Sequence, residues 1–308
     1  MNMTEKKAYT DAVLCLTKKP SKAHCTIKGA KSRYDDFQGI HSAQTDFIHW
    51  VGHFLPWHRY HLATFEKALR EECEYKYGLP YWDWTIDTKS GKRMDDWPVF
   101  DAATGLGGNG PFIPLTKKEN PFGLIRTGGG CVRDGPFTWP NFVLNLGPTK
   151  DTSKTNPHCL TRDFAPTLAA FNLLESVVDE TMSQPDFGSF TRRVESVPSF
   201  TVPTIHGGGH FSVGGVLGSI SNAYNSPADP IFWLHHANLD RIWWNWQKQM
   251  IWSRTQDISG PIVPFDYENK AAGNVTLDFK VNLGEVGAEV QLWELMHIQE
   301  GVLCYDYI

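Results

Sequence analysis

The chain has 308 residues, 41% of them hydrophobic, and a formal net charge of −5 with acidic and basic residues scattered along it. This length and apolar content allow a substantial core, and the lack of a basic stripe argues against nucleic acid as a partner. No apolar run approaches the roughly 20 residues that a membrane-spanning helix needs. The first ten residues, "MNMTEKKAYT", contain no apolar signal core. We therefore expect no membrane association, and a chain from which any secretion signal has already been removed.

The first strong helical pattern runs from about residue 56 to residue 77, and Gly78 and Pro80 break it. Apolar residues and a histidine recur in it at steps of three and four, which places them on one helix face. These residues are His58, Leu62, Phe65, Leu69 and Cys73. The pattern predicts an amphipathic helix that carries a histidine on its buried side.

The rest of the chain alternates between loops and helices. Residues 85–156 are rich in Gly, Pro and Asn and predict long ordered loops, whereas 163–180 and 230–249 return to helical spacing. The tail from Val275 alternates more like strands. Since no flexible linker separates the halves, we predict a single domain over 1–308.

Six cysteines and two glycosylation sequons bear on the compartment. The sequons begin at Asn2 and Asn274, and no CxxC pair indicates a zinc ribbon or a thioredoxin-type site. Six cysteines allow 15 full pairings, and the sequence selects none of them. An even cysteine count together with sequons favours an oxidising, secretory setting. Reduced buried thiols in a cytosolic protein are the alternative.

Most of the 12 histidines fall in two clusters. The first lies in and before the stretch "HWVGHFLPWHRYHL", and the second spans "TIHGGGHF" and "WLHHANLD". The clusters contain His41, His49, His53, His58 and His61, and then His206, His210, His235 and His236. The three others, His24, His158 and His297, are isolated, and we expect them on the surface or in loops.

A shared metal explains so many imidazoles among apolar residues better than a repeated coincidence of buried histidines. If "TIHGGGHF" is helical, His206 and His210 face the same way at i and i+4. Three successive glycines weaken that helix by on the order of 2–3 kcal/mol relative to alanine, so something must hold the turn, and a metal is one candidate. The chain has no HExxH zinc-protease motif.

Imidazole-only sites suit copper, zinc, nickel or iron, and divalent affinity peaks at copper. Six or more histidines in two comparable groups predict two metal ions with three ligands each. Two coppers held in this way would leave open positions between them for dioxygen.

Two longer stretches resemble the copper-binding signatures of the type 3 copper proteins, which are the tyrosinases, catechol oxidases and haemocyanins. These are "HSAQTDFIHWVGHFLPWHR" and "HGGGH" followed by "NSPADPIFWLHHANLDRIWWNWQ". The likeness is greatest to the short fungal polyphenol oxidases and continues through "LPYWDW", "PVFDAATGLGGNGPF" and the terminal "YDY". It implies a mainly α fold: a four-helix bundle that holds a dicopper centre, with long loops and small peripheral β elements.

The resemblance also implies the ligands. The first copper would be held by His41, His49 and His58, and the second by His206, His210 and His236. In the family pattern the last ligand lies four residues before an aspartate, here Asp240, which selects His236 over its neighbour. His53 and His61 match no family ligand and are expected behind the ligands or in the pocket.

Asp240 would lie beside His236 on a helix. A buried carboxylate needs a partner, for which Arg59 is a candidate, although an ordinary salt bridge elsewhere is the alternative.

The activity implied is oxidation of o-diphenols to o-quinones with reduction of dioxygen to water, so small phenols and dioxygen are the expected partners. Some family members position a water with a glutamate and an asparagine for monophenol hydroxylation. Here Gly207 stands where that asparagine would be, and Glu195 is a loosely aligned candidate for the glutamate. This favours a catechol oxidase with weak or variable monophenol hydroxylation, although glycine also widens the entrance. Phe211 and Ile220 are candidates for the pocket wall and mouth, or for plain core.

Two departures from common family patterns stand out. The cysteine that many fungal tyrosinases link to the second histidine is replaced by Phe47, and the chain ends after "YDY", where family zymogens continue into a C-terminal lid. We therefore expect no thioether of that kind and no lid domain. A full tyrosinase, an o-aminophenol oxidase and a haemocyanin-type oxygen carrier remain alternatives. The sequence does not predict the oligomeric state.

Two rival motifs fail. "HGGG" also matches the oxyanion loop of esterases, but no serine lies in a GxSxG elbow. "GLGGNG" matches a dinucleotide-binding pattern, but Pro111 follows it and no buried strand precedes it.

Overall fold

A computed structural model describes residues 1–197, 199 and 201–308. Most of the regular structure is helical, and the helices are α1 (Met3–Leu16), α2 (Arg33–Ile48), α3 (Phe54–Cys73), α4 (Trp84–Lys89), α5 (Pro166–Asn172), α6 (Glu175–Met182), α7 (Phe187–Glu195), α8 (Ile205–Gly214), α9 (Ile231–Lys248) and α10 (Ile251–Arg254). A two-stranded antiparallel sheet pairs β1 (Lys280–Val281) with β2 (Val290–Gln291). None of the described helices is long and apolar enough to cross a membrane.

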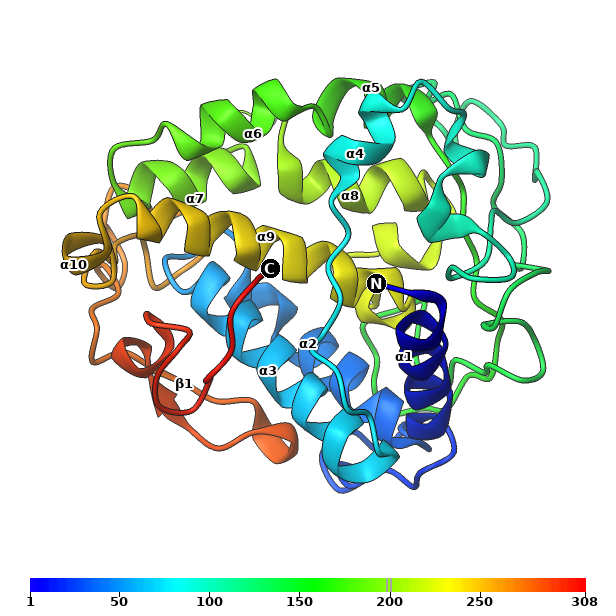
Figure 1. Cartoon of the computed structure of the whole chain (residues 1–308), viewed down its shortest axis with the longest axis horizontal. Helices are drawn as coiled ribbons and strands as arrows, with labels where there is room; N and C mark the ends of the chain where they lie inside the picture. The colour runs from blue at the N-terminus through cyan, green and yellow to red at the C-terminus, as the bar shows by residue number, and fades with distance from the viewer. Residues whose placement is uncertain (198, 200) are drawn as a thin grey trace.

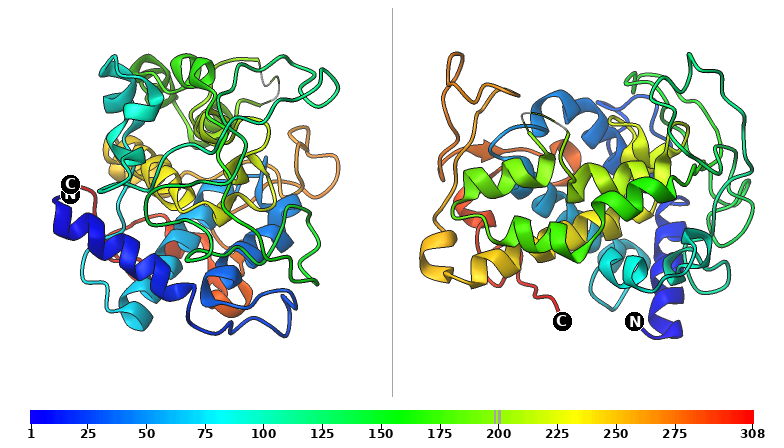
Figure 2. Two further views of the ribbon diagram at one scale, coloured as in Figure 1. Left: turned by 90° about the vertical axis from the view of Figure 1, so that its right-hand side faces the viewer. Right: turned by 90° about the horizontal axis from the view of Figure 1, so that it is seen from above.

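Helix α9 runs through the middle of the molecule (Figure 1). Helices α2 and α3 lie on one side of it, and α5, α6, α7 and α8 lie on the other, as the view from above also shows (Figure 2). The loops between α4 and α5 gather at one end. The predicted fold class is confirmed: a mainly α protein whose central helices form a bundle, with long loops and small β elements at the margin.

Local signals explain where the central helices begin and end. Helix α2 begins with a capping box, in which the Ser32 and Asp35 side chains each accept from the other's backbone N–H. Helix α3 ends because Glu74 takes a left-handed conformation with φ 57°, a few residues before the predicted end at residue 77. The predicted helix over 230–249 is confirmed as α9. The predicted helix over 163–180 is divided into α5 and α6, since Leu174 is extended.

Five helices, α1, α2, α4, α7 and α10, were not predicted, and α4 lies at the start of the stretch that was predicted as loops. The buried face of α2 is largely polar, so it shows no apolar stripe; its buried polar residues are Arg33, Asp35, Asp36, Gln38, His41, Ser42 and Thr45. The strand-like tail is mostly irregular, because its strands are only two residues long.

Buried ion pairs order the long loops. Arg162 and Asp229 are both fully buried and form a bidentate pair, with Nε–Oδ2 and Nη2–Oδ1 distances of 2.8 Å. Arg162 also donates to the backbone carbonyls of Leu106 and Gly107, and Asp229 lies just before α9. This one pair therefore fixes a distant loop to the start of the central helix.

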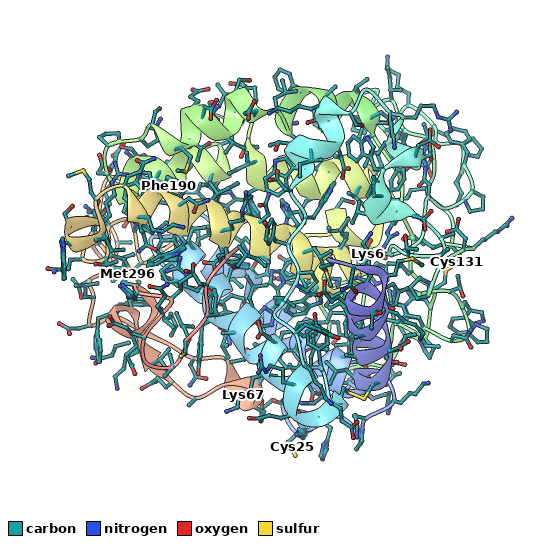
Figure 3. The ribbon with its side chains drawn as sticks, viewed as in Figure 1. Lys6, Cys25, Lys67, Cys131, Phe190 and Met296 are labelled. Atoms are coloured by element: carbon teal, nitrogen blue, oxygen red, sulfur yellow. A yellow bond between two sulfur atoms is a disulfide. The ribbon has the colours of Figure 1, made fainter. Side chains whose placement is uncertain are left out.

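Two disulfides join segments far apart in the sequence. Cys15 of α1 is bonded to Cys73 at the end of α3, and Cys131 is bonded to Cys159 within the loops. Cys25 and Cys304 are exposed and free. Cys25 lies at the lower edge of the molecule in Figure 3, whereas Cys131 lies on the loop side.

We predict that Arg162→Leu destabilises the protein by about 3–5 kcal/mol, because it leaves the Asp229 carboxylate buried without its partner. The free energy of unfolding in urea measures the effect. Lys7→Ala is the matched control, since it removes an exposed pair with Asp11, and such a pair contributes at most about 1 kcal/mol. Equal losses in the two variants would contradict the role assigned to the buried pair.

Candidate metal centre

Six histidines from the four central helices meet in two groups of three. The first triad consists of His41 on α2, His49 directly after α2, and His58 on α3; the second consists of His206 and His210 on α8 and His236 on α9. Within each triad, one ring nitrogen from each histidine lies within 4.8 Å of the others. The structure thus brings together the same six residues that the sequence suggested.

The two triads face each other. The rings of His58 and His236 stack with centroids 4.6 Å apart and planes 13° apart. The rings of His49 and His206 are nearly parallel, with centroids 6.0 Å apart. The six imidazoles therefore surround one shared space.

Backbone carbonyls fix the proton on four of these rings. A carbonyl only accepts, so the ring nitrogen beside it, Nδ1, must carry the hydrogen and Nε2 keeps its lone pair. The pairs are His41 with Tyr224 O (3.2 Å), His49 with Thr45 O (3.0 Å), His58 with Phe54 O (2.8 Å) and His210 with Ile220 O (2.8 Å). Four Nε2 atoms are thereby prepared to bind a metal.

Burial lowers the pKa of all six imidazoles, to about 4 for His49 and His210. The rings are therefore neutral at pH 7, the form that binds metal. Nε2 of His41, His58 and His206 is buried without a hydrogen-bond partner. Buried polar atoms seldom stay unsatisfied, and an imidazole-only donor set suits copper. These residues fit a pair of copper ions.

Packing explains the glycine-rich start of α8. A Cβ on Gly209 would lie 2.1 Å from the His235 ring, and one on Gly208 would lie 2.4 Å from Asn172 Cβ. A Cβ on Gly207 would meet nothing closer than 3.5 Å. Close contact with α5 and α9 therefore accounts for two of the three glycines, and a metal is not needed to hold the turn.

No role was predicted for His235. Its Nε2 lies 2.9 Å from the backbone carbonyl oxygen of His206, and the ring fills the space beside Gly209. His235 thus ties the first turn of α8 to α9, next to His236. Neighbouring a ligand in the sequence was the only signal, and it does not indicate this contact.

Neither His53 nor His61, the other two histidines of the first cluster, lines the cavity beside the triads. His53 Nε2 hydrogen-bonds the Phe47 carbonyl at 2.9 Å, and the exposed Phe47 side chain is also outside the pocket. His61 is buried behind His41, with ring centroids 6.4 Å apart. His61 therefore lies behind a ligand, as expected.

An ion-pair network joins the ligand-bearing helices. Arg59 Nε donates to Asp240 Oδ1 at 2.5 Å, and both side chains are buried, which confirms the expected partner. The hydroxyls of Tyr305 and Tyr307 donate to Asp240 Oδ2 at 2.5 and 2.6 Å. The terminal "YDY" is thus attached where α3 and α9 meet, beside His58 and one turn from His236.

A cavity of about 410 Å³ opens beside the triads, and His49, His206 and His210 are in its wall. All four predicted pocket residues line it: Glu195, Gly207, Phe211 and Ile220. Phe211 is half-exposed, whereas the Ile220 side chain is fully buried and its carbonyl accepts from His210.

Glu195 is the acidic residue of this wall. Its Oε1 accepts from the Trp50 backbone N–H at 2.8 Å, and its buried Oε2 has no hydrogen-bond partner among the residues that the structure describes. Burial raises the pKa of its carboxyl well above the ordinary range. A buried carboxyl therefore lies in the same cavity as the imidazoles.

Comparison with known proteins gives consistent results. Residues 31–249 match the family model "Common central domain of tyrosinase". The chain is 34% identical to the tyrosinase-like protein phomQ1 of Diaporthe leptostromiformis, over 97% of this chain and 73% of that protein. It is 33% identical to the N-acetyl-6-hydroxytryptophan oxidase ivoB of Emericella nidulans, over 98% of this chain and 88% of that one.

A solved structure extends the comparison to the fold. A mutant polyphenol oxidase from Thermothelomyces thermophila superimposes with a TM-score of 0.85 at 32% identity, over 100% of this chain and 86% of that one. Sequence and fold thus point to the same family.

We predict opposite results for two alanine substitutions in α8. Gly209→Ala destabilises the protein by about 1–3 kcal/mol, because the new methyl group overlaps the His235 ring. Gly207→Ala is neutral or stabilises by up to about 1 kcal/mol, because its methyl group makes only ordinary van der Waals contacts, at 3.5 Å or more, and alanine favours a helix. Urea unfolding of the metal-free protein measures both, and a larger loss at Gly207 would show the packing to be misassigned.

Proposed function

This chain belongs to the tyrosinase family of copper oxidases, and we propose that within it the protein is a catechol oxidase, which converts o-diphenols to o-quinones with dioxygen as the oxidant. The observation that carries the proposal is one cavity that two neutral histidine triads share. Gly207 lies in its wall, at the position where a polar side chain would assist the hydroxylation of monophenols. Its volume of about 410 Å³ accommodates an aromatic ring, which favours an enzyme over an oxygen carrier.

The tyrosinase family binds two copper ions, and the two triads fit them. We assign the first copper to His41, His49 and His58, and the second to His206, His210 and His236. When bound, the copper pair supplies dioxygen binding and takes up the electrons of the phenol. Each catechol loses two electrons and two protons, and two catechols reduce one dioxygen to two waters.

The protein's own groups prepare the site. Neutral imidazoles hold the metals without competing protons, and their Nδ1–H bonds to carbonyls fix the ring orientation. The aromatic side chains in the cavity lining, Trp50, Phe171 and Phe211, would pack against a planar ring. Glu195 would bind the substrate hydroxyl or a water at Oε2, which is buried in the cavity wall.

A second candidate is a full tyrosinase. Gly207 places no side chain in the cavity wall, which leaves a wider entrance for monophenols, and one relative is named for the oxidation of a hydroxytryptophan. Oxidation of o-aminophenols is a third candidate, because these rings carry the same adjacent pair of donors.

We also propose that the 308 residues act as one catalytic domain in an oxidising, secretory compartment. Matches along 97% and 98% of this chain, which cover 73% and 88% of the two relatives, support the first part. Two disulfides support the second, since such bonds persist mainly outside the reducing cytosol.

Oxygen uptake by the copper-loaded protein tests the activity. We predict rapid uptake with catechol and little or lagging uptake with phenol. Gly207→Asn should raise the phenol-to-catechol ratio about tenfold, which is the worth of one good hydrogen bond to the substrate. Comparable uptake with both substrates in the unchanged protein would make it a tyrosinase, fast uptake with o-aminophenol alone would favour the third candidate, and reversible oxygenation without turnover would indicate a carrier.

Copper content tests the ligand assignment. We predict that His58→Ala and His210→Ala each lose one of the two coppers and nearly all oxidation, because each removes one of three ligands. Metal analysis after dialysis measures the loss. His24→Ala, at an exposed loop position, should keep both coppers. Full copper content and activity in either ligand variant would refute the assignment.

A further inference from the structure

The outer part of the cavity is lined by half-exposed apolar side chains. Phe171 on α5 is 51% exposed, and Phe211 on α8 is 48% exposed. Val202, Leu168 and Trp50 also line the cavity. The Trp50 ring stacks on that of Phe265, with ring centroids 4.7 Å apart. Large apolar side chains that remain exposed around a functional pocket commonly mark a contact surface for a ligand.

Charge is almost missing from the same wall. Apart from the histidines, the one ionisable side chain among the described lining residues is Glu195, which is deeply buried and has a raised pKa. The sequence from residue 196 to residue 204, "SVPSFTVPT", carries no charged residue. Arg193, just before it, is committed elsewhere, since its Nη2 lies 2.7 Å from Glu180 Oε2 and its Nη1 donates to the Pro203 carbonyl.

Four of the uncharged polar side chains of the wall are already hydrogen-bonded within the protein. Asn172 donates to the Leu168 carbonyl and accepts from the Thr204 backbone N–H. The hydroxyls of Ser196, Thr204 and Ser221 donate to backbone carbonyls. These groups therefore offer little to a charged substituent that would lose its water on entering.

We propose that this pocket selects phenols that carry uncharged, apolar substituents, such as alkyl or aryl groups, over phenols that carry an ammonium or a carboxylate group. The inference rests on the proposed function, since it names the substrate class of the same site. The ring enters toward the imidazoles, and its substituent remains among Phe171, Phe211 and Val202.

General energetics set the size of the effect. A single methylene group in an apolar pocket changes kcat/KM by roughly 10–200-fold. A charged group that is desolvated without a partner is disfavoured further. We therefore expect kcat/KM for an apolar catechol to exceed that for each charged catechol by at least about tenfold, mainly through KM.

The test compares four catechols on the copper-loaded protein by oxygen uptake: 4-tert-butylcatechol, dopamine, dopa and 3,4-dihydroxyphenylacetate. The same compounds are titrated calorimetrically into metal-free protein, where no oxidation occurs. We expect 4-tert-butylcatechol to give the highest kcat/KM and the tightest binding. Equal or better kcat/KM and binding for any charged catechol would overturn the inference, while oxidation as such would still support the proposed function.

Charge substitution localises the effect. Phe171→Arg should raise kcat/KM for 3,4-dihydroxyphenylacetate several-fold and leave dopamine unfavourable, because it adds a cation at the mouth. Phe122→Arg is the matched control, since Phe122 is 95% exposed and lies outside the lining; it should change no ratio. Identical substrate profiles in the two variants would overturn the location that we assign.

The two proposals fail separately. If no catechol is oxidised but the metal-free protein still prefers 4-tert-butylcatechol, the proposed function is wrong and the pocket chemistry is supported. If all four are oxidised with similar kcat/KM, the proposed function is supported and the selectivity is wrong.

Discussion

The structure depends on one constraint: ring nitrogens from six histidines must meet inside the protein while several of their lone pairs stay unpaired. An unsatisfied buried acceptor destabilises a fold by about 1–3 kcal/mol, and Nε2 of His41, His58 and His206 are all of this kind. The surrounding helices offset this through apolar packing and through buried ion pairs such as Arg59–Asp240. Metal binding to the native state adds stability at the same place. The core and the metal centre are therefore energetically linked.

Groups that would touch no metal account for much of the precision with which the histidine rings are positioned. Backbone carbonyls set the tautomers of four rings, and His235 holds the first turn of α8 against α9. Gly208 and Gly209 allow that approach because they lack a side chain. Of these three glycines, Gly207 alone has no close neighbour that excludes a side chain, and it lines the cavity, so a small side chain can be introduced there without overlap. Structural and chemical constraints thus act on adjacent residues of one helix turn.

Part of this was predictable from the sequence. Helices α3 and α9 have clear apolar periodicity. The six ligand histidines follow from the resemblance to the family's copper signatures, and Arg59 was one of two open possibilities as the partner of Asp240. Helix α2 was missed because its buried face is polar, which hides the usual pattern. The role of His235 and the reason for the glycines depend on how closely α5, α8 and α9 approach, which spacing does not encode. The uncharged mouth of the cavity could not be predicted either, because four segments far apart in the sequence contribute to it, around Trp50, Phe171, Val202 and Phe211.

The bond between Cys15 and Cys73 closes a covalent loop with a sequence separation of 58, and His41, His49 and His58 all lie inside it. In the chain-entropy model, a crosslink of this span lowers the conformational entropy of the unfolded chain and so stabilises the folded state by about 4 kcal/mol. His206, His210 and His236 lie outside both disulfide loops. Reduction of this disulfide therefore releases the segment that carries the first triad. The second triad lies in no disulfide loop, so reduction leaves its covalent connections unchanged, and the two halves of the centre differ in their dependence on redox state.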